Sequence, residues 1–140
     1  MVVNAFEALM NEFSEAVGIN LKPEGDACVL KLRDGLLIRF EYRPVENDLL
    51  VFSILGSVPP GRYRESLFRA ALISNGLPYP RYGVFAFHPS EDQLILYFRR
   101  SLIELNGVKI AYAFTPFVEK ARTWRDAITS NSIPGVTAYR

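Results

Sequence analysis

The chain has 140 residues and a mass of 15.8 kDa, and its 16 Lys and Arg against 15 Asp and Glu give a formal net charge of +1. This length suits one domain with a substantial core, and the near-zero charge gives no general attraction to nucleic acid or anionic lipid. One cysteine excludes a disulfide framework and no apolar run approaches the ~20 residues of a membrane span, so we expect a soluble, cytoplasmic protein.

The first half of the chain predicts one helix followed by three strands. An amphipathic helix that ends at Gly18 is indicated by the spacing of Phe6, Leu9, Met10, Phe13 and Val17. Alternating apolar residues predict strands over 28–33, 36–43 and 49–55, with Asp34-Gly35 as a two-residue hairpin turn. These three strands should form an antiparallel meander.

The second half predicts a helix, two strands and a final helix. After the breakers at 59–61, a helix over 62–74 should stop at Asn75-Gly76. A loop containing Pro78 and Pro80 then leads to strands over 82–88 and 92–100. The last helix, over 110–128, contains Pro116, which must kink it or lie near a new helix start.

The resulting element order is αβββαββα, which is typical of an α+β fold. We expect a five-stranded antiparallel sheet with three helices, forming a single domain over residues 1–130. Residues 131–140, with Pro134 and Gly135, are predicted to be a flexible tail.

The predicted strands are apolar on both faces. Leu50, Phe52 and Ile54 alternate with Leu49, Val51 and Leu55, and Phe85 and Phe87 alternate with Val84 and Ala86. An antiparallel sheet with helices on one face normally shows polar residues on the other. Since large apolar patches on soluble domains mark partner surfaces, this surplus favours binding over chemistry.

Few residues offer catalytic or metal-binding chemistry. His88 is the only histidine and precedes a turn proline, and Cys28 lies in an alternating strand segment, which favours a buried structural thiol. Gly56 and Gly61 have the spacing of phosphate-loop glycines, but Arg62-Tyr63 follows where Lys-Ser/Thr is required. We therefore predict no enzyme activity, no metal and no cofactor.

One segment suggests an alternative, a nucleic-acid surface. In residues 81–87, aromatic side chains alternate along a strand beside Arg81, a pattern that can stack bases and hold phosphates. The wider element order is wrong for an RNA-recognition fold, and the net charge does not favour it. An RNA-binding domain is thus the weaker alternative.

The order and spacing of these elements resemble the type III secretion chaperones of the class that includes the Tir chaperone (CesT) family. The resemblance covers residues 6–128 and rests on the first helix, the strands over 28–33, 36–43, 83–87 and 94–98, the helix end Ala71-Leu72-Ile73-Ser74-Asn75, and the terminal helix with Trp124. It implies a cytosolic bacterial homodimer without enzymatic activity. Such chaperones are usually acidic, whereas this chain has a pI near 7.8.

The resemblance also implies partners. The expected client is the N-terminal region of a secreted effector, which the chaperone keeps extended and delivers to the secretion apparatus; the secretion ATPase is a further partner that it allows. No nucleic acid and no membrane are expected. A regulatory or sensory module with the same fold is the alternative that the neutral charge leaves open.

Two sets of residues are predicted to make these contacts. The surplus apolar surface predicts effector binding by Phe6, Phe13, Ile38, Phe40, Leu50, Phe52 and Ile54, with Arg39 orienting the client at the rim. The second helix and the strand after it predict a dimer interface at Tyr63, Leu67, Ala70, Ala71, Phe85 and Phe87.

Overall fold

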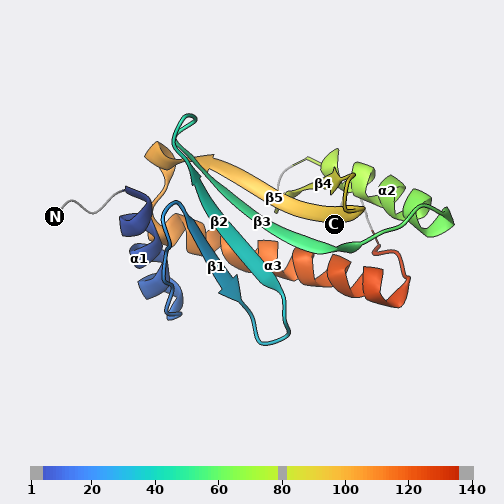
Figure 1. Cartoon of the computed structure of the whole chain (residues 1–140), viewed down its shortest axis with the longest axis horizontal. Coiled ribbons are helices and arrows are strands. Elements are labelled where there is room, and N and C mark those ends of the chain that lie inside the picture. Colours follow the sequence, from blue (N-terminus) through green and yellow to red (C-terminus); the bar gives the residue numbers. More distant parts are fainter. Residues whose placement is uncertain (1–4, 79–81, 136–140) are drawn as a thin grey trace. The chain divides into compact units, whose positions relative to one another are not determined.

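The computed structural model describes residues 5–78 and 82–135 and has the predicted order of helices and strands (Figure 1). The elements are α1 (Ala5–Val17), β1 (Ala27–Lys31), β2 (Leu37–Arg43), β3 (Asp48–Ser57), α2 (Arg62–Asn75), β4 (Val84–His88), β5 (Gln93–Ser101), the short 3-10 helix η1 (Leu102–Glu104) and α3 (Gly107–Ser130). The strands form one five-stranded sheet in the order β1-β2-β3-β5-β4. The α+β fold and the αβββαββα order are therefore confirmed, while η1 was not predicted.

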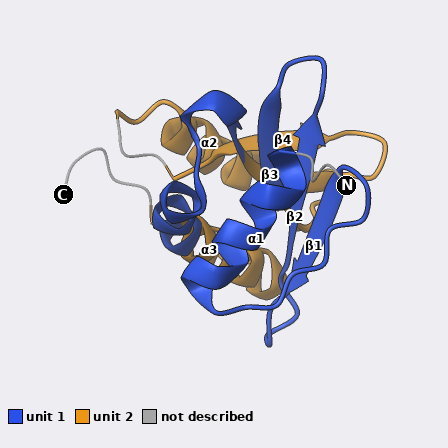
Figure 2. Ribbon diagram, turned by 90° about the vertical axis from the view of Figure 1, so that its left-hand side faces the viewer, with its two compact units in different colours: residues 1–52, 98–116 blue, residues 53–97, 117–140 orange. Residues whose placement is uncertain are grey.

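The chain divides into two compact units (Figure 2). Unit 1 comprises Met1–Phe52 and Phe98–Pro116, and unit 2 comprises Ser53–Tyr97 and Phe117–Arg140. Three elements, β3, β5 and α3, contribute residues to both units. The predicted single domain over 1–130 stays a prediction.

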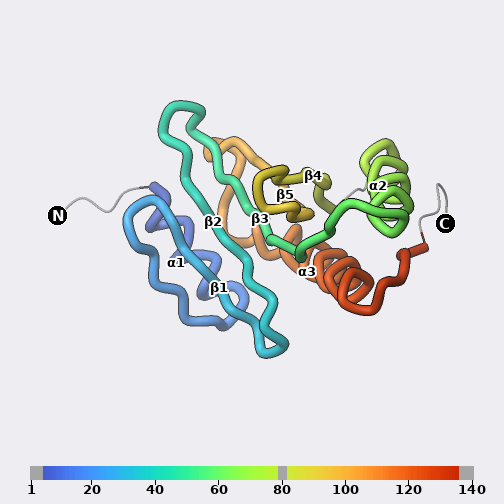
Figure 3. Tube along the Cα trace, turned by 45° about the vertical axis from the view of Figure 1, so that its right-hand side comes forward, coloured from blue at the N-terminus to red at the C-terminus, as the bar shows by residue number. Residues whose placement is uncertain are grey.

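Unit 1 packs α1 against its strands through aromatic rings. Figure 3 shows α1 beside β1 and β2. The side chains of Phe6, Met10 and Phe13, spaced at i, i+4 and i+7, are fully buried, as the helical periodicity predicts. The ring of Phe13 lies 5.4 Å from that of Phe40 and 5.1 Å from that of Phe114, measured between centroids. This cluster joins α1, β2 and the first part of α3 in one core.

Unit 2 builds its core from α2, β4 and the second part of α3. Phe85 packs against Trp124 with ring centroids 4.2 Å apart, and Phe68 meets Phe87 edge to face at 4.9 Å. The hydroxyl of Tyr63 reaches the carbonyl oxygens of Ala127 and Ser132, at 3.1 and 2.8 Å. These contacts attach α2 to the end of α3.

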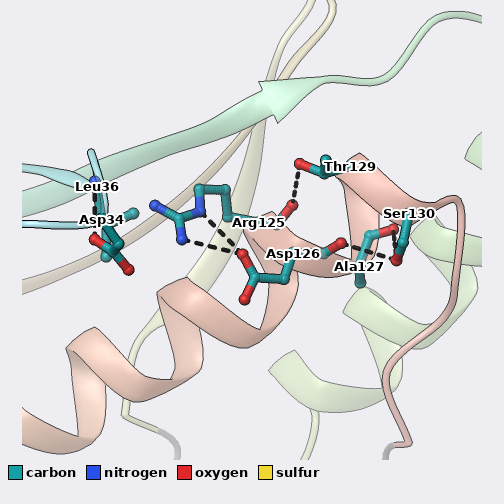
Figure 4. Close-up of polar contacts among 7 residues, drawn as sticks. All are labelled: Asp34, Leu36, Arg125, Asp126, Ala127, Thr129 and Ser130. Atoms are coloured by element: carbon teal, nitrogen blue, oxygen red, sulfur yellow. Dashed lines mark hydrogen bonds and ion pairs between the residues drawn. The ribbon is translucent and has the colours of Figure 1, made fainter.

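The end of α3 is closed by local side-chain bonds (Figure 4). The hydroxyl of Thr129 donates to the carbonyl oxygen of Arg125 at 3.1 Å, and that of Ser130 donates to Asp126 at 2.9 Å. Hydroxyl groups near a helix end often bond backward in this way. Residues 131–135 of the predicted flexible tail are described, and the remainder, 136–140, lies outside the described residues.

Most element ends differ from the sequence prediction by a few residues, and two of the differences change how the chain path is understood. β4 begins at Val84 because Tyr82 and Gly83 have positive φ angles of 53° and 116°, which a strand does not accept. α3 begins at Gly107 and contains Pro116 within one helix instead of starting a new one there. Pro80, in the predicted loop before β4, lies outside the described residues.

Candidate functional site

The strand register of unit 1 places a mixed apolar and charged surface on one face of its sheet. Residues opposite one another on paired strands point to the same side. Val29 lies opposite Arg39 and Arg39 opposite Phe52, while Glu41 lies opposite Leu50. We call this surface the open face and define it by Val29, Leu37, Arg39, Glu41, Leu50 and Phe52.

Solvent reaches most of the open face. Val29 is 52% exposed and Leu37 is 50% exposed, which is high for aliphatic side chains on a sheet, and Leu50 and Phe52 are half-buried. The Nε of Arg39 lies 2.7 Å from Oε1 of Glu41, so an ion pair lies in the middle of the apolar rows. A surface of this kind can bury apolar side chains of a partner and orient them through the paired charges.

A second charged group lies at the end of the hairpin that joins β2 to β3. The guanidinium of Arg43 binds Asp48 through two bonds, Nε to Oδ1 at 2.8 Å and Nη2 to Oδ2 at 3.1 Å, and Nη1 of Arg99 lies 3.9 Å from Oδ2. The hydrogen bond from Arg43 lowers the pKa of the Asp48 carboxyl below its usual value. The same bond raises the pKa of Arg43. This pair stays ionised across the neutral range and holds the two strand ends together.

Four of the predicted client-binding residues lie away from the open face. Phe6, Phe13, Ile38 and Phe40 are all fully buried. Ile38 and Phe40 alternate with the open-face residues of β2, and the ring of Phe13 covers Phe40 from α1. These four side chains form core of unit 1 and are closed to a partner in this arrangement.

The other predicted client residues are accessible. Leu50, Phe52 and Arg39 belong to the open face of unit 1, as described above. Ile54 belongs to unit 2 and is 48% exposed. Val29 and Leu37 complete the open face and were missed by sequence reasoning, although their alternation with Cys28, Leu30 and Ile38 could have identified them.

Most of the predicted dimer residues contribute to the core of unit 2. Leu67, Ala70, Ala71 and Phe85 are buried, whereas Tyr63 and Phe87 are half-buried. The exposed apolar side chains of α2 are instead Leu72 and Ile73, at 70% and 50% exposure. Neither residue is among those that the sequence predicted for the dimer interface.

Of the aromatic residues that suggested base stacking, Phe85 and Phe87 pack inside unit 2, whereas Tyr82 is 49% exposed. The ring of Phe85 is covered by Trp124, and the Nζ of Lys120 lies 4.9 Å from its centroid. The guanidinium of Arg64 lies 4.9 Å from the centroid of Phe87. Their contacts are those of a packed core, and Arg81 lies outside the described residues.

The residues with reactive side chains have structural surroundings. The Cys28 thiol is buried, and burial raises its pKa, which disfavours the nucleophilic thiolate at neutral pH. His88 is exposed, with Nδ1 3.0 Å from the hydroxyl of Ser90. Among residues 5–78 and 82–135, no group of three or more His, Cys, Asp or Glu side chains is arranged to hold a metal ion. Across the same residues, no helix is both long and apolar enough to cross a membrane.

A groove of about 430 Å³ lies in unit 1 beside the start of α3, which sequence reasoning did not predict. It is lined by Glu12, Glu15, Ala16, Asn106, Gly107 and Val108. The backbone N–H of Gly107 donates to Oε1 of Glu12 at 3.0 Å, so this carboxylate caps the helix. The groove is thus partly filled by a structural contact.

Comparison with known protein families gives one clear match. The profile of the Tir chaperone protein (CesT) family matches residues 8–125, which is most of the chain. A search of curated protein sequences finds no match.

Solved structures with low sequence identity share this fold. A chain of the HopA1-SchA chaperone-effector complex superposes with a TM-score of 0.69 at 15% identity, covering 90% of this chain and 100% of that one. A chain of the ExoT-SpcS complex from Pseudomonas aeruginosa gives 0.67 at 17% identity, with 87% and 98% covered. The Yersinia pestis type III secretion chaperone SycH in complex with a fragment of YscM2 gives 0.63 at 18% identity, with 86% and 98% covered. These likenesses establish the fold.

Proposed function

Because the chain belongs to the Tir chaperone protein (CesT) family, we propose that it is a type III secretion chaperone that binds a secreted effector. The client contact is the N-terminal region of the effector, which is held extended and competent for secretion. The observation that supports this most strongly is the open face, where aliphatic side chains about half exposed surround an ion pair. Two of the solved structures with this fold are complexes of a chaperone with its partner.

The open face suits an extended chain for physical reasons. An extended segment presents alternate side chains to one side, and the rows of Val29, Leu37 and Phe52 offer apolar contacts at strand spacing. Each fully buried client side chain of Leu or Phe size contributes about 1.5–3 kcal/mol. Ordering the client offsets part of this gain, so several anchors are needed for stable binding.

The end strand β1 provides a second means of binding. It is the first strand in the sheet order, so among the described strands one side of its backbone has no neighbour. A client segment can add there through main-chain hydrogen bonds while its side chains reach the open face. Main-chain bonds give affinity with little sequence preference, and the side-chain contacts give selectivity.

The proposal includes the setting in which the chaperone acts. We propose a homodimer in the bacterial cytosol that hands its client to the secretion apparatus, with the secretion ATPase as the docking partner. No step of this cycle requires a catalytic residue, in keeping with the buried Cys28 thiol and the exposed His88.

The test begins with the client itself. The protein is purified from its native cytosol with its bound partner, the partner is identified by mass spectrometry, and its N-terminal segment is titrated by calorimetry. We expect Phe52→Glu to weaken binding at least about tenfold, because a charge replaces an apolar anchor. Leu50→Asp and Ile54→Asp test the neighbouring positions on β3.

Val45→Glu is the matched control. It also puts a charge on an exposed apolar residue, but Val45 is 94% exposed in the turn between β2 and β3 and does not belong to the open face. Circular dichroism separates lost binding from lost folding. The proposal is wrong if the co-purifying molecule is an RNA or a metabolite, or if the control and Phe52→Glu weaken binding equally.

A further inference from the structure

One side chain binds both backbone groups of a residue at the end of the sheet. The Nδ2 of Asn75 donates to the carbonyl oxygen of Phe85 at 3.0 Å, and the N–H of Phe85 donates to Oδ1 of Asn75 at 2.8 Å. Asn75 is the last residue of α2, and Phe85 lies in β4, the final strand in the sheet order. Figures 1 and 3 both show α2 beside β4.

The bonding of Phe85 reveals which way its backbone faces. In an antiparallel pair, successive residues alternately bond to the partner strand and face away from it. β4 pairs with β5, and Phe85 bonds to Asn75, so Phe85 faces away from β5 while Val84 and Ala86 face toward it. The amide of Asn75 therefore offers a donor and an acceptor at the place where a further strand would offer them.

The sequence of β4 contains none of the residues that usually block strand pairing at a sheet end. An unprotected strand at a sheet end is a template for pairing with another chain, and proteins block such strands with lysine, proline, bulges or a covering segment. Residues 84–88 read Val-Phe-Ala-Phe-His, which contains no lysine or proline and consists mostly of residues that favour strands. Protection must therefore come from outside the strand.

We propose that Asn75 is an edge-blocking residue that prevents a second copy of this chain from pairing with β4 strand to strand. A second copy is the relevant occupant because it carries the same β-prone strand at equal concentration, and two such strands can pair antiparallel. The role is independent of client binding. It also differs from the proposed dimer contact, because it excludes one geometry of self-association.

The experiment compares Asn75→Ala and Asn75→Asp with Asn11→Ala, a control on the exposed side of α1. Amide exchange is measured by NMR at Phe85 and, as an internal reference, at Ala86, whose N–H faces β5. Sedimentation velocity over a range of concentrations reports assembly size. In Asn75→Ala we expect exchange at Phe85 to accelerate about tenfold or more relative to Ala86, with association beyond the wild-type assembly at high concentration.

Asn75→Asp tests the hydrogen-bond chemistry and does not depend on Asn75→Ala remaining folded. Its carboxylate keeps an acceptor for the Phe85 N–H but cannot donate to the Phe85 carbonyl oxygen. We expect association at neutral pH that declines when acid protonates the carboxyl, because its O–H can then donate. A purely space-filling role would give no such pH dependence.

A third variant identifies the surface used. Adding Ala86→Lys to Asn75→Ala places a charge on the exposed side of β4 and should restore the wild-type assembly size. The proposal is overturned if Asn75→Ala and Asn75→Asp both keep the wild-type assembly size at every concentration, or if Ala86→Lys leaves the new association unchanged.

Discussion

At the scale of single residues, close packing requires a glycine at position 107. A Cβ atom placed there would lie 2.4 Å from the backbone carbon of Glu12 and 2.6 Å from the backbone N of Phe13. Backbone atoms of a packed helix cannot move aside as the end of a flexible side chain can. The first turn of α3 thus approaches α1 as closely as only glycine allows.

We predict that Gly107→Ala lowers the free energy of unfolding by about 1–3 kcal/mol, the usual cost of overpacking. Urea denaturation monitored by circular dichroism measures the change. Gly135→Ala is the matched control, because a Cβ there meets no atom within 4 Å. Equal unfolding midpoints for the two variants would contradict the steric explanation.

The bond between Asp48 and Arg43 gives a pH-dependent prediction. The hydrogen bond from Arg43 lowers the folded-state pKa of Asp48, so the unfolded state binds more protons in the acid range. The stabilisation is therefore complete above the unfolded pKa, about 3.9, and is lost as pH falls through the lower folded pKa. As the pH falls from about 5 to about 2, we expect the urea midpoint of Asp48→Asn to fall less steeply than that of the wild type.

The salt dependence of stability checks the contribution of the ion pair between Asp48 and Arg43. The Asp48 side chain is 14% exposed and that of Arg43 is 31% exposed, so added salt should screen part of the interaction. At about 1 M NaCl, where the Debye length is about 3 Å, the difference between wild type and Asp48→Asn should shrink. Identical acid profiles at low salt would show that the pair does not contribute.

At the scale of elements, the periodic patterns predicted all three helices and five strands. They could not decide which face of β3 is core. Leu49, Val51 and Leu55 alternate with residues that are just as apolar, and only the packing of the helices buries the first set and leaves Phe52 and Ile54 accessible. Phe13 and Phe40 were predicted to bind the client but are buried in the core for the same reason, since an apolar residue suits a core and a partner surface equally.

For α2, too, the sequence pattern predicts the buried residues but not every contact of the helix. Leu67, Ala70, Ala71 and Ser74 follow the i, i+3, i+4, i+7 spacing and are buried, as the period requires. Leu72 and Ile73 lie off this stripe and are exposed. The bonds of Asn75 to Phe85 join residues ten apart across a loop, and no local pattern carries that information.

At the scale of the whole molecule, the exposed side of α2 bears on self-association. Leu72 and Ile73 are exposed on a helix whose other side is buried, so they offer an apolar contact to a partner of α2. A stable protein interface buries about 1,200–2,000 Å² in total. Leu72 and Ile73 can form the centre of such an interface but cannot supply its whole area. Within unit 2, the half-buried Tyr63 and Phe87 are further candidates for interface residues.

We predict that the protein is a homodimer and that a Leu72→Asp, Ile73→Asp double variant is a folded monomer. Light scattering should give twice the 15.8 kDa chain mass for the wild type and the chain mass for the double variant. Leu67→Asp is the contrasting change, because burying its charge in unit 2 should unfold the protein instead of separating the subunits. A wild-type chain that stays monomeric at all concentrations would exclude the dimer, and a double variant that stays dimeric would move the interface away from α2.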